Sequence, residues 1–153
     1  MSVDVNLDGK AKEGTTEIKQ ILVAEDVHEG TIKDVVVIEG ANFDSGAPEK
    51  KIVQNIELAD GIVSKWSSPK ITKGSGTYSS SNLFVLLEKA NLLADFASYV
   101  DNITQSENQE ERLATYLNGK LAGKKCKVLT KTVTKKDGSG KYSKVDKYVS
   151  IEN

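Results

Sequence analysis

The order of the predicted secondary-structure elements constrains the fold of this chain more than any other feature. β-Branched residues fill the segment 31–38, and the segments 51–58 and 62–66 have the same strand character. A segment rich in Gly, Asn, Asp, Ser and Pro, 40–48, separates the first two strands, and Asp60-Gly61 is a strong turn signal before the third. Three strands joined by short connections predict an antiparallel meander.

A helical segment follows the third strand. Apolar residues recur at helical spacing over 83–97, and the three serines at 79–81 are candidates for the N-cap. Thr104-Gln-Ser-Glu107 matches a capping box, which predicts a second helix that continues through Tyr116. Asn118-Gly119 predicts the end of that helix.

The chain closes with a predicted β-hairpin. Its strands, 126–135 and 141–151, are rich in lysine and β-branched residues, and a turn of Asp and Gly residues lies between them. The first 17 residues are polar and punctuated by glycine, so we expect 1–17 to be a flexible tail and 18–153 to be a single domain. The short apolar run 21–24 fits either a first strand or a helical turn.

Five strands with a helix or helix pair between the third and the fourth is the arrangement of an OB-fold, a small Greek-key β-barrel. We therefore predict a mainly β protein with a helical insertion, folded as a five-stranded barrel. An immunoglobulin-like sandwich fits worse, because it has no place for a helix of this length. In OB-folds, oligonucleotides bind across strands 2 and 3, between the loops that join strands 1–2 and 4–5.

The rarest residue types limit the chemistry of the chain. One Cys (Cys126) and one His (His28) cannot supply the ligands of a zinc site without heavy use of carboxylates, and a single thiol cannot form an internal disulfide. A Ser-His-Asp or Cys-His arrangement would have to use His28, which has no nucleophile motif nearby. We therefore expect no enzymatic activity, no metal and no cofactor.

The overall composition is that of a soluble globular domain, with 38% hydrophobic and 28% charged residues. No stretch approaches the roughly 18 to 20 apolar residues of a membrane-spanning helix. The first residues have neither the basic start nor the apolar run of a signal peptide. Since a lone thiol also agrees with a reducing compartment, we expect a cytoplasmic protein without membrane contact.

Positive charge is concentrated towards the C-terminus, although the formal net charge is only −1. Residues 119–153 carry ten lysines and three acidic residues, whereas residues 1–118 carry 11 basic and 19 acidic residues. A second segment, 61–87, has no acidic residue and contains Lys65, Lys70 and Lys73. Phosphate contacts are local, so such a chain can bind a polyanion despite its near-neutral total charge. A solvated hairpin whose lysines block edge-to-edge aggregation is the alternative.

Aromatic side chains near these lysines are candidates for base stacking. Trp66 follows Lys65 and precedes a loop of Ser, Thr and Gly, so it is either a core residue or a stacking platform. Tyr78 in that loop and Phe43 in the loop between the first two strands are further candidates. Single-strand binders combine a basic groove with exposed rings, and each stacked base contributes about 1 to 3 kcal/mol.

The predicted phosphate contacts on the hairpin are Lys131, Lys135, Lys136 and Lys141. Tyr142 and Tyr148 are six residues apart, so in a regular strand they face the same side, with Lys144 and Asp146 between them. We expect this polar row to point away from the core, and we include Tyr142 and Lys144 in the candidate site. The residues expected in the core instead are Val145, Val149 and Ile151.

Short motifs also occur in a characteristic order along residues 28–152. They are Glu29-Gly30-Thr31, Asp60-Gly61, Lys65-Trp66, Ser81-Asn-Leu-Phe-Val-Leu-Leu87, Leu121-Ala-Gly-Lys-Lys-Cys-Lys-Val128 and Lys141-Tyr-Ser-Lys-Val145. In this order the chain resembles a family of phage and archaeal OB-fold proteins that bind single-stranded DNA and are encoded with replication or recombination genes. The resemblance implies binding without sequence preference and no catalysis. The stretch 102–119 is longer than the usual link of that family.

The sequence thus predicts a single-stranded-DNA-binding protein of DNA replication or recombination, which acts by aromatic stacking and lysine–phosphate contacts. RNA as the ligand, replication proteins as partners and a homo-oligomer stay open. The alternative is an OB-fold module for protein interaction or assembly that docks a partner through its acidic N-terminal part and does not bind nucleic acid. The acidity of residues 1–118 and the single arginine, Arg112, favour the alternative, because nucleic-acid sites usually contain more arginine.

Overall fold

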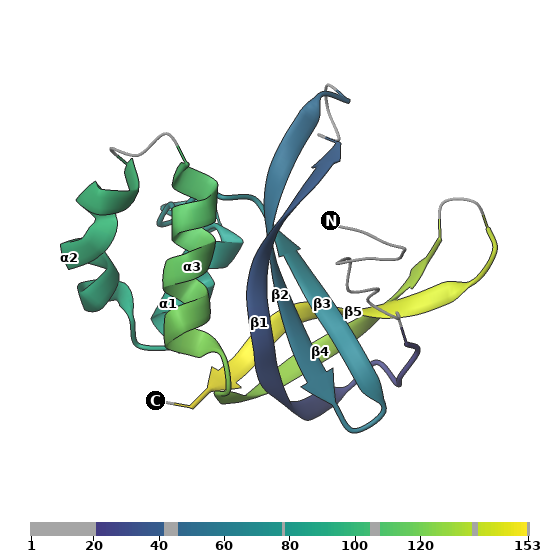
Figure 1. Ribbon diagram of the computed structural model, residues 1–153. Coiled ribbons are helices and arrows are strands. Elements are labelled where there is room, and N and C mark those ends of the chain that lie inside the picture. Colours follow the sequence, from purple (N-terminus) through teal and green to yellow (C-terminus); the bar gives the residue numbers. More distant parts are fainter. Residues whose placement is uncertain (1–20, 42–45, 78, 105–107, 136–137, 153) are drawn as a thin grey trace, which may run out of the picture.

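The computed structural model describes residues 21–41, 46–77, 79–104, 108–135 and 138–152. Three strands come first, namely β1 (Val27–Ala41), β2 (Pro48–Leu58) and β3 (Gly61–Ser67). Three helices follow, α1 (Asn82–Lys89), α2 (Leu93–Thr104) and α3 (Gln109–Leu121), and then β4 (Lys125–Thr134) and β5 (Lys141–Ile151) (Figure 1). The order confirms the predicted mainly β fold with a helical insertion between the third and fourth strands.

All five strands form one antiparallel sheet in the order β3-β2-β1-β4-β5. The central strand, β1, changes partner along its length, since residues 27–31 pair with β4 and residues 31–41 pair with β2. Gly30 lies at this change, and a Cβ atom there would be 2.9 Å from the backbone oxygen of Glu57. The absence of a side chain at Gly30 is what lets the strands approach this closely.

The sheet is not closed into a barrel, which corrects the predicted closure. Its two edges are β3 and β5. In the described part of the chain a side chain joins them, because Nζ of Lys65 donates a hydrogen bond of 2.6 Å to the backbone oxygen of Asp146. We call this open side the seam. β5 has bulges at Asp146 and Val149, and these interrupt the even backbone spacing that a continuous ladder with β3 would need.

The helical insertion consists of three helices, not the one or two that the sequence predicts. Asn91 has a left-handed backbone (φ 59°), and this ends the first helix well before residue 97. Asparagine visits this conformation more readily than most residues. At the start of α1, Oγ of Ser81 accepts a hydrogen bond of 3.3 Å from the backbone N–H of Phe84, which confirms one of the three predicted N-caps.

The predicted boundaries of the next helix are wrong. Thr104, expected as its N-cap, is the last residue of α2, and α3 begins only at Gln109. At the other end α3 continues through Asn118-Gly119 to Leu121. Tertiary contacts override the local stop signal, because Leu121 is fully buried and Oδ1 of Asn118 accepts a hydrogen bond of 2.9 Å from the backbone N–H of Val35.

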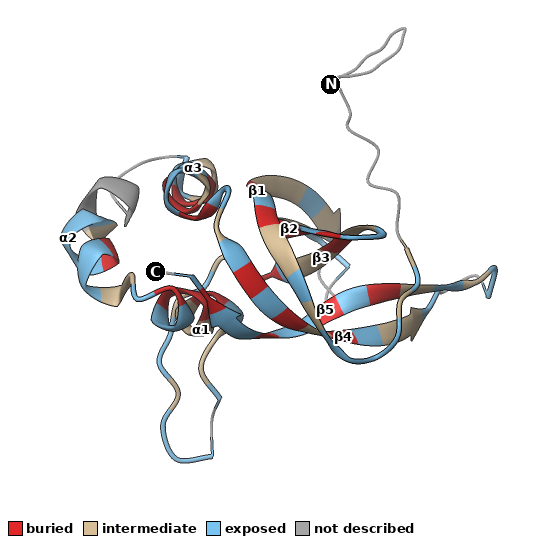
Figure 2. Cartoon of the chain, turned by 90° about the horizontal axis from the view of Figure 1, so that it is seen from below, coloured by how far each residue is buried: buried red, intermediate tan, exposed pale blue. Residues whose placement is uncertain are grey.

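The helices pack beside the sheet, and the core lies between them (Figure 2). Its fully buried members from the helices are Leu83, Leu86, Leu87, Leu117 and Leu121, and those from the strands are Ile32, Ile52, Ile56 and Val128. Each buried side chain of this size contributes about 1.5 to 3 kcal/mol. Tyr116 fastens α2 to α3, because its hydroxyl donates a hydrogen bond of 2.6 Å to Asp95. Within the described ranges, no helix is long and apolar enough to span a membrane.

A buried polar cluster connects β2, β3 and β5 close to the seam. Oε1 of Gln54 accepts a hydrogen bond of 3.2 Å from the hydroxyl of Tyr148. Nε2 of Gln54 donates to the backbone oxygen of Ile52 (2.9 Å) and to Oγ of Ser67 (3.3 Å). Burial raises the pKa of the Tyr148 hydroxyl well above its ordinary value, so this group stays a donor at neutral pH.

The position of Tyr148 in this cluster corrects the predicted facing of β5. Tyr148 is 2% exposed, whereas Val149, expected in the core, is 39% exposed. The bulge at Asp146 is the cause, because it adds one residue to β5 and so reverses the sides of Tyr148 and Val149. The bulge at Val149 reverses the phase again, which returns Ile151 to the core side. Val145 and Ile151 are buried, as predicted.

Residues 21–26, before β1, form neither a strand nor a helical turn. The backbone N–H of Ser143 in β5 donates to the backbone oxygen of Ile21 (2.7 Å), and Oγ of Ser143 accepts from the N–H of Val23 (2.8 Å). Ile21 also reaches the β2–β3 turn, because a Cβ at Gly61 would lie 2.7 Å from its Cγ2. This segment therefore lies between the turn and the hairpin, at one end of the seam.

Candidate nucleic-acid interface

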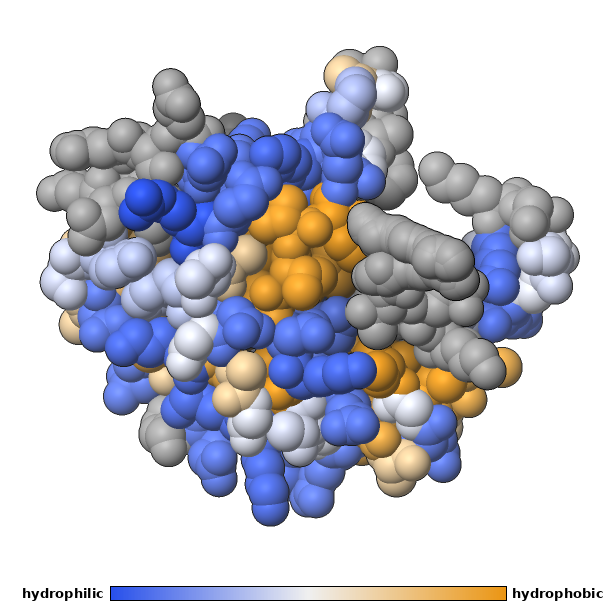
Figure 3. Space-filling view, in the orientation of Figure 1, coloured by the Kyte–Doolittle hydropathy of each residue, from blue (hydrophilic) through white to orange (hydrophobic). Residues whose placement is uncertain are grey.

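The outer face of β1–β2–β3, opposite the core, carries a row of apolar residues. Val36, Val53 and Trp66 are register partners across the three strands, and Ile38 lies beyond Val36 on the same face. We call this side the Trp66 face. Figure 3 shows hydrophobic residues at the surface over this part of the sheet, bordered by hydrophilic ones.

Trp66 is a surface residue of this face, since its side chain is 50% exposed. Its Cζ3 atom lies 3.8 Å from the position of a Cβ at Gly40, so the indole reaches across β2 to β1. Its register partner, Val53, is fully buried. The exposure excludes Trp66 as a core residue and leaves a supported ring that is open to solvent. A supported, exposed ring is what base stacking needs.

A hydrogen-bonded polar row lies next to the row of Trp66. Nδ2 of Asn55 donates to Oδ1 of Asp34 (2.7 Å), and the hydroxyl of Ser64 donates to Oδ1 of Asn55 (2.6 Å). These bonds connect β1, β2 and β3 side by side and therefore fix the surface on which Trp66 lies. The carboxylate of Asp34 is thereby engaged within the sheet.

Lys65 does not share the face of its neighbour Trp66, because successive residues of a strand point to opposite sides. Its side chain is directed to the seam, where it bonds Asp146. Desolvation lowers the pKa of Lys65, and the charge of Lys144 lowers it further, whereas the carboxylate of Asp146 raises it. Lys65 thus holds the two sheet edges together and does not contribute to the Trp66 face.

Lys70 and Lys73 are exposed in the loop between β3 and α1. Two hydrogen bonds between Thr72 and Ser81 close the base of this loop. Oγ of Ser81 accepts from the backbone N–H of Thr72 (2.9 Å), and the backbone N–H of Ser81 donates to the backbone oxygen of Thr72 (2.9 Å). Figure 2 shows the loop beside α1, with the β4–β5 hairpin projecting from the opposite end of the molecule. The structure therefore does not bring Lys70 and Lys73 together with the lysines of the hairpin.

The predicted lysines of the hairpin lie on two sides of it. Lys131 and Lys144 are exposed register partners on the outer side, opposite the buried Thr130 and Val145. Tyr142 lies on that side too and is half-buried. Alternation places Lys141 on the other side, and Lys135 follows the last residue of β4 near the tip. Phe43, Tyr78 and Lys136, like the predicted tail 1–17, lie outside the described residues.

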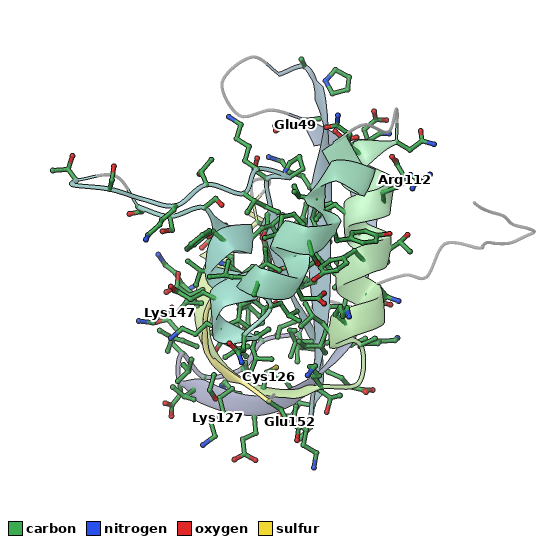
Figure 4. All side chains as sticks on the ribbon, turned by 90° about the vertical axis from the view of Figure 1, so that its left-hand side faces the viewer. Glu49, Arg112, Cys126, Lys127, Lys147 and Glu152 are labelled. Carbon is green, nitrogen blue, oxygen red and sulfur yellow. The ribbon has the colours of Figure 1, made fainter. Side chains whose placement is uncertain are left out.

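Two lysines that sequence reasoning did not select, Lys127 and Lys147, also lie on the outer side of the hairpin. Lys127 is opposite Ser150, and Lys147 is opposite Leu129. Figure 4 shows both side chains at the periphery of the molecule. Alternation within β4 could have identified Lys127, because it shares the phase of Lys131. Lys147 could not be identified, because the bulge at Asp146 determines its side.

The single cysteine is buried and the single histidine is within hydrogen-bonding distance of a backbone oxygen. Burial raises the pKa of the Cys126 thiol to about 11, which keeps it protonated at neutral pH. Nε2 of His28 lies 2.8 Å from the backbone oxygen of Ala24. Among the residues that the structure describes, no group of three or more His, Cys, Asp or Glu side chains could hold a metal ion.

Comparisons with protein families, with curated proteins and with solved structures find no match to this chain. The resemblance to the phage and archaeal single-strand binders therefore stays a prediction.

Proposed function

We propose that this protein binds single-stranded nucleic acid without sequence preference on the Trp66 face, in the replication or recombination of DNA. The observation that carries the proposal is the environment of Trp66, an indole that is half-exposed and supported by two neighbouring strands. An exposed tryptophan on an apolar sheet face is unfavourable in water. A stacked base covers such a ring and so removes that cost.

We also propose that the fold is an OB-fold with an incomplete barrel. The strand order, the central β1 shared by β2 and β4, and the helices between β3 and β4 agree with its topology. At the seam the side chain of Lys65 spans the gap between the edges β3 and β5, because its Nζ donates a hydrogen bond to the backbone oxygen of Asp146. In this fold the oligonucleotide crosses strands 2 and 3, and Trp66 lies on strand 3.

The β4–β5 hairpin supplies the positive charge of the proposed site. It projects beyond the sheet (Figure 1), with Lys135 near its tip and Lys141 on the side away from Lys131 and Lys144. Both lysines are exposed. Long, exposed ammonium groups on a projecting hairpin can reach a phosphodiester backbone that passes the Trp66 face.

The test is fluorescence anisotropy of labelled oligo-dT, with the same titration on duplex and at several salt concentrations. We expect tighter binding to the single strand and a steep dependence on salt. Trp66→Ala should weaken binding by about 5- to 150-fold, the equivalent of one lost stack, and Trp66→Phe should weaken it less. Lys135→Gln with Lys141→Gln should reduce the salt slope by up to about 1.4, because each single-strand contact contributes about 0.7.

Tyr99→Ala is the matched control, because Tyr99 is an exposed aromatic residue of α2, on the helical side of the molecule. Its affinity for oligo-dT should equal that of the wild type. Absence of binding at low salt would overturn the proposal and favour the protein-interaction module, for which the apolar Trp66 face would be the docking surface. Binding that Trp66→Ala leaves unchanged would remove Trp66 from the site.

A further inference from the structure

Four exposed lysines share the outer side of β4–β5, and we call them the lysine face: Lys127, Lys131, Lys144 and Lys147. The neighbouring residues Val128, Thr130, Val145 and Tyr148 are buried on the other side. The bulge at Asp146 is essential for this grouping. In a regular strand Lys147 would share the side of Val145 and would enter the core.

The register of the hairpin places like charges next to one another on the lysine face. Lys131 and Lys144 are directly opposite, and Lys147 follows Lys144 on the same side of β5. Like charges in opposite positions of an antiparallel pair destabilise it. The ion pairs found among the described residues involve other lysines, Lys50, Lys51 and Lys120. The fold gains no stability from this arrangement, whereas a bound polyanion would relieve the repulsion.

Three acidic residues border the lysine face. Oε2 of Glu25 accepts a hydrogen bond of 2.8 Å from the backbone N–H of Thr132, next to Lys131. Glu29 of β1 is the register partner of Lys127, and Asp146 occupies the bulge beside Lys147. The face still carries more positive than negative charge. Its middle is apolar, because Leu129 is paired with Val27, which is 46% exposed. Lysines around an apolar strip fit a ligand whose charged phosphates alternate with less polar sugars and bases.

The lysine face is separate from the Trp66 face, and the seam lies between them. Trp66 lies on the outer face of β3, next in sequence to Lys65 of the seam, whereas Lys144 and Lys147 lie on either side of Asp146 on the outer side of β5. The bond between Lys65 and Asp146 therefore marks the point where the two surfaces approach each other. Figures 1 and 2 show that β3 and β5 belong to different layers at this point.

We propose that the lysine face is a second binding surface for phosphodiester backbone, and that a single strand bound on the Trp66 face continues over the seam onto it. This inference rests on the proposed function. The inference extends the proposed function in two respects. The bound strand is longer than the Trp66 face alone can hold, and the part of the strand on the lysine face is held by charge without recognition of bases.

The test compares short and long oligo-dT, of about 5 and about 16 nucleotides, which span the range of site sizes for one OB-fold. Trp66 is the only tryptophan, so quenching of its fluorescence reports occupation of the Trp66 face. Anisotropy of the labelled strand reports total binding. The variant is Lys131→Gln with Lys144→Gln and Lys147→Gln, and removal of the opposed charges should not impair its folding.

The triple variant should bind the short strand with wild-type quenching and an affinity within about twofold of wild type. Its affinity for the long strand should fall by up to about 50-fold at about 0.15 M salt, and the salt slope should fall by up to about 2, from three contacts of about 0.7 each. The control, Lys89→Gln with Arg112→Gln and Lys120→Gln, removes the same charge from α1 and α3 and should behave as wild type.

Unchanged affinity and salt slope for the long strand would overturn the second surface and leave the proposed function intact. If the triple variant loses affinity for duplex and for the single strand to the same extent, the proposal that a single strand continues onto the lysine face would be overturned. If labelled strand binds and the triple variant loses this binding, but Trp66 is not quenched, the lysine face stands and the Trp66 site fails. If the wild type binds neither strand, both proposals fail.

Discussion

Two glycines that look alike in the sequence occupy opposite environments, and their replacement by alanine tests the path of β1. A Cβ at Gly30 would lie 2.9 Å from the backbone oxygen of Glu57, 2.9 Å from Cγ2 of Ile56 and 2.8 Å from Cδ2 of Leu58. A Cβ at Gly119, in the exposed part of α3, would meet nothing within 4 Å. Alanine therefore collides at Gly30 and fits at Gly119.

The two substitutions should change the free energy of unfolding in opposite directions. Gly30→Ala should lower it by about 2 to 3 kcal/mol, the upper part of the range for an added methyl group in a packed site. The methyl of Leu58 can rotate away, but the oxygen of Glu57 can move only if the β1–β2 pairing loosens. Gly119→Ala should raise the free energy of unfolding by roughly 0.5 to 1 kcal/mol, because glycine is unfavourable inside a helix.

Urea unfolding, followed by circular dichroism and by the fluorescence of Trp66, measures both effects. A difference of about 3 kcal/mol between the variants separates their midpoints by about 2 M urea if the m-value is about 1.5 kcal/mol per M. A Gly30→Ala protein that unfolds at or above the wild-type midpoint would refute the change of partner at Gly30. A destabilised Gly119→Ala protein would show that α3 ends before this residue, as the sequence alone predicts.

Two further predictions concern buried groups. Tyr148→Phe removes the donor to Oε1 of Gln54 and should destabilise the fold by about 1 to 2 kcal/mol in the same urea assay; Tyr142→Phe, on the outer side of the hairpin, is the control, and equal effects would contradict the assignment. Because burial raises the pKa of Cys126 to about 11, folded protein at pH 8 should react with a thiol reagent far more slowly than urea-unfolded protein, and a fast native reaction would show that the thiol is accessible.

The order of the elements could be predicted because each strand and helix carries its own local signal. The β-branched run of β1, the Asp60-Gly61 turn and the lysine-rich hairpin all lie where the sequence places them. The helix boundaries could not be predicted in this way. The stop signal at Asn118-Gly119 is genuine local chemistry, but α3 continues because burial of Leu121 and the bond from Asn118 to β1 outweigh it.

The composition of the candidate site was harder to predict than the fold, because it depends on which side each residue faces. Alternation along a strand places Lys65 and Trp66 on opposite sides, so the assignment of both residues to one binding surface could have been avoided from the sequence. The sides on which the residues of β5 lie were not predictable, because the residue types at 146 and 149, Asp and Val, do not indicate a bulge. The bulge at Asp146 brings Lys147 to the surface and places Tyr148 in the core with Gln54.

The two interpretations of the lysine-rich hairpin explain different residues, so they need not compete. Natural sheets protect their edges with bulges and with charged residues that point inward. Lys65 on β3 and the bulges of β5 have these properties, and both lie at the seam. Protection of an edge does not require Lys131 and Lys144 to face each other on the outer side, where their repulsion weakens the pairing it would protect. These opposed lysines therefore need another explanation, and binding of a polyanion supplies one.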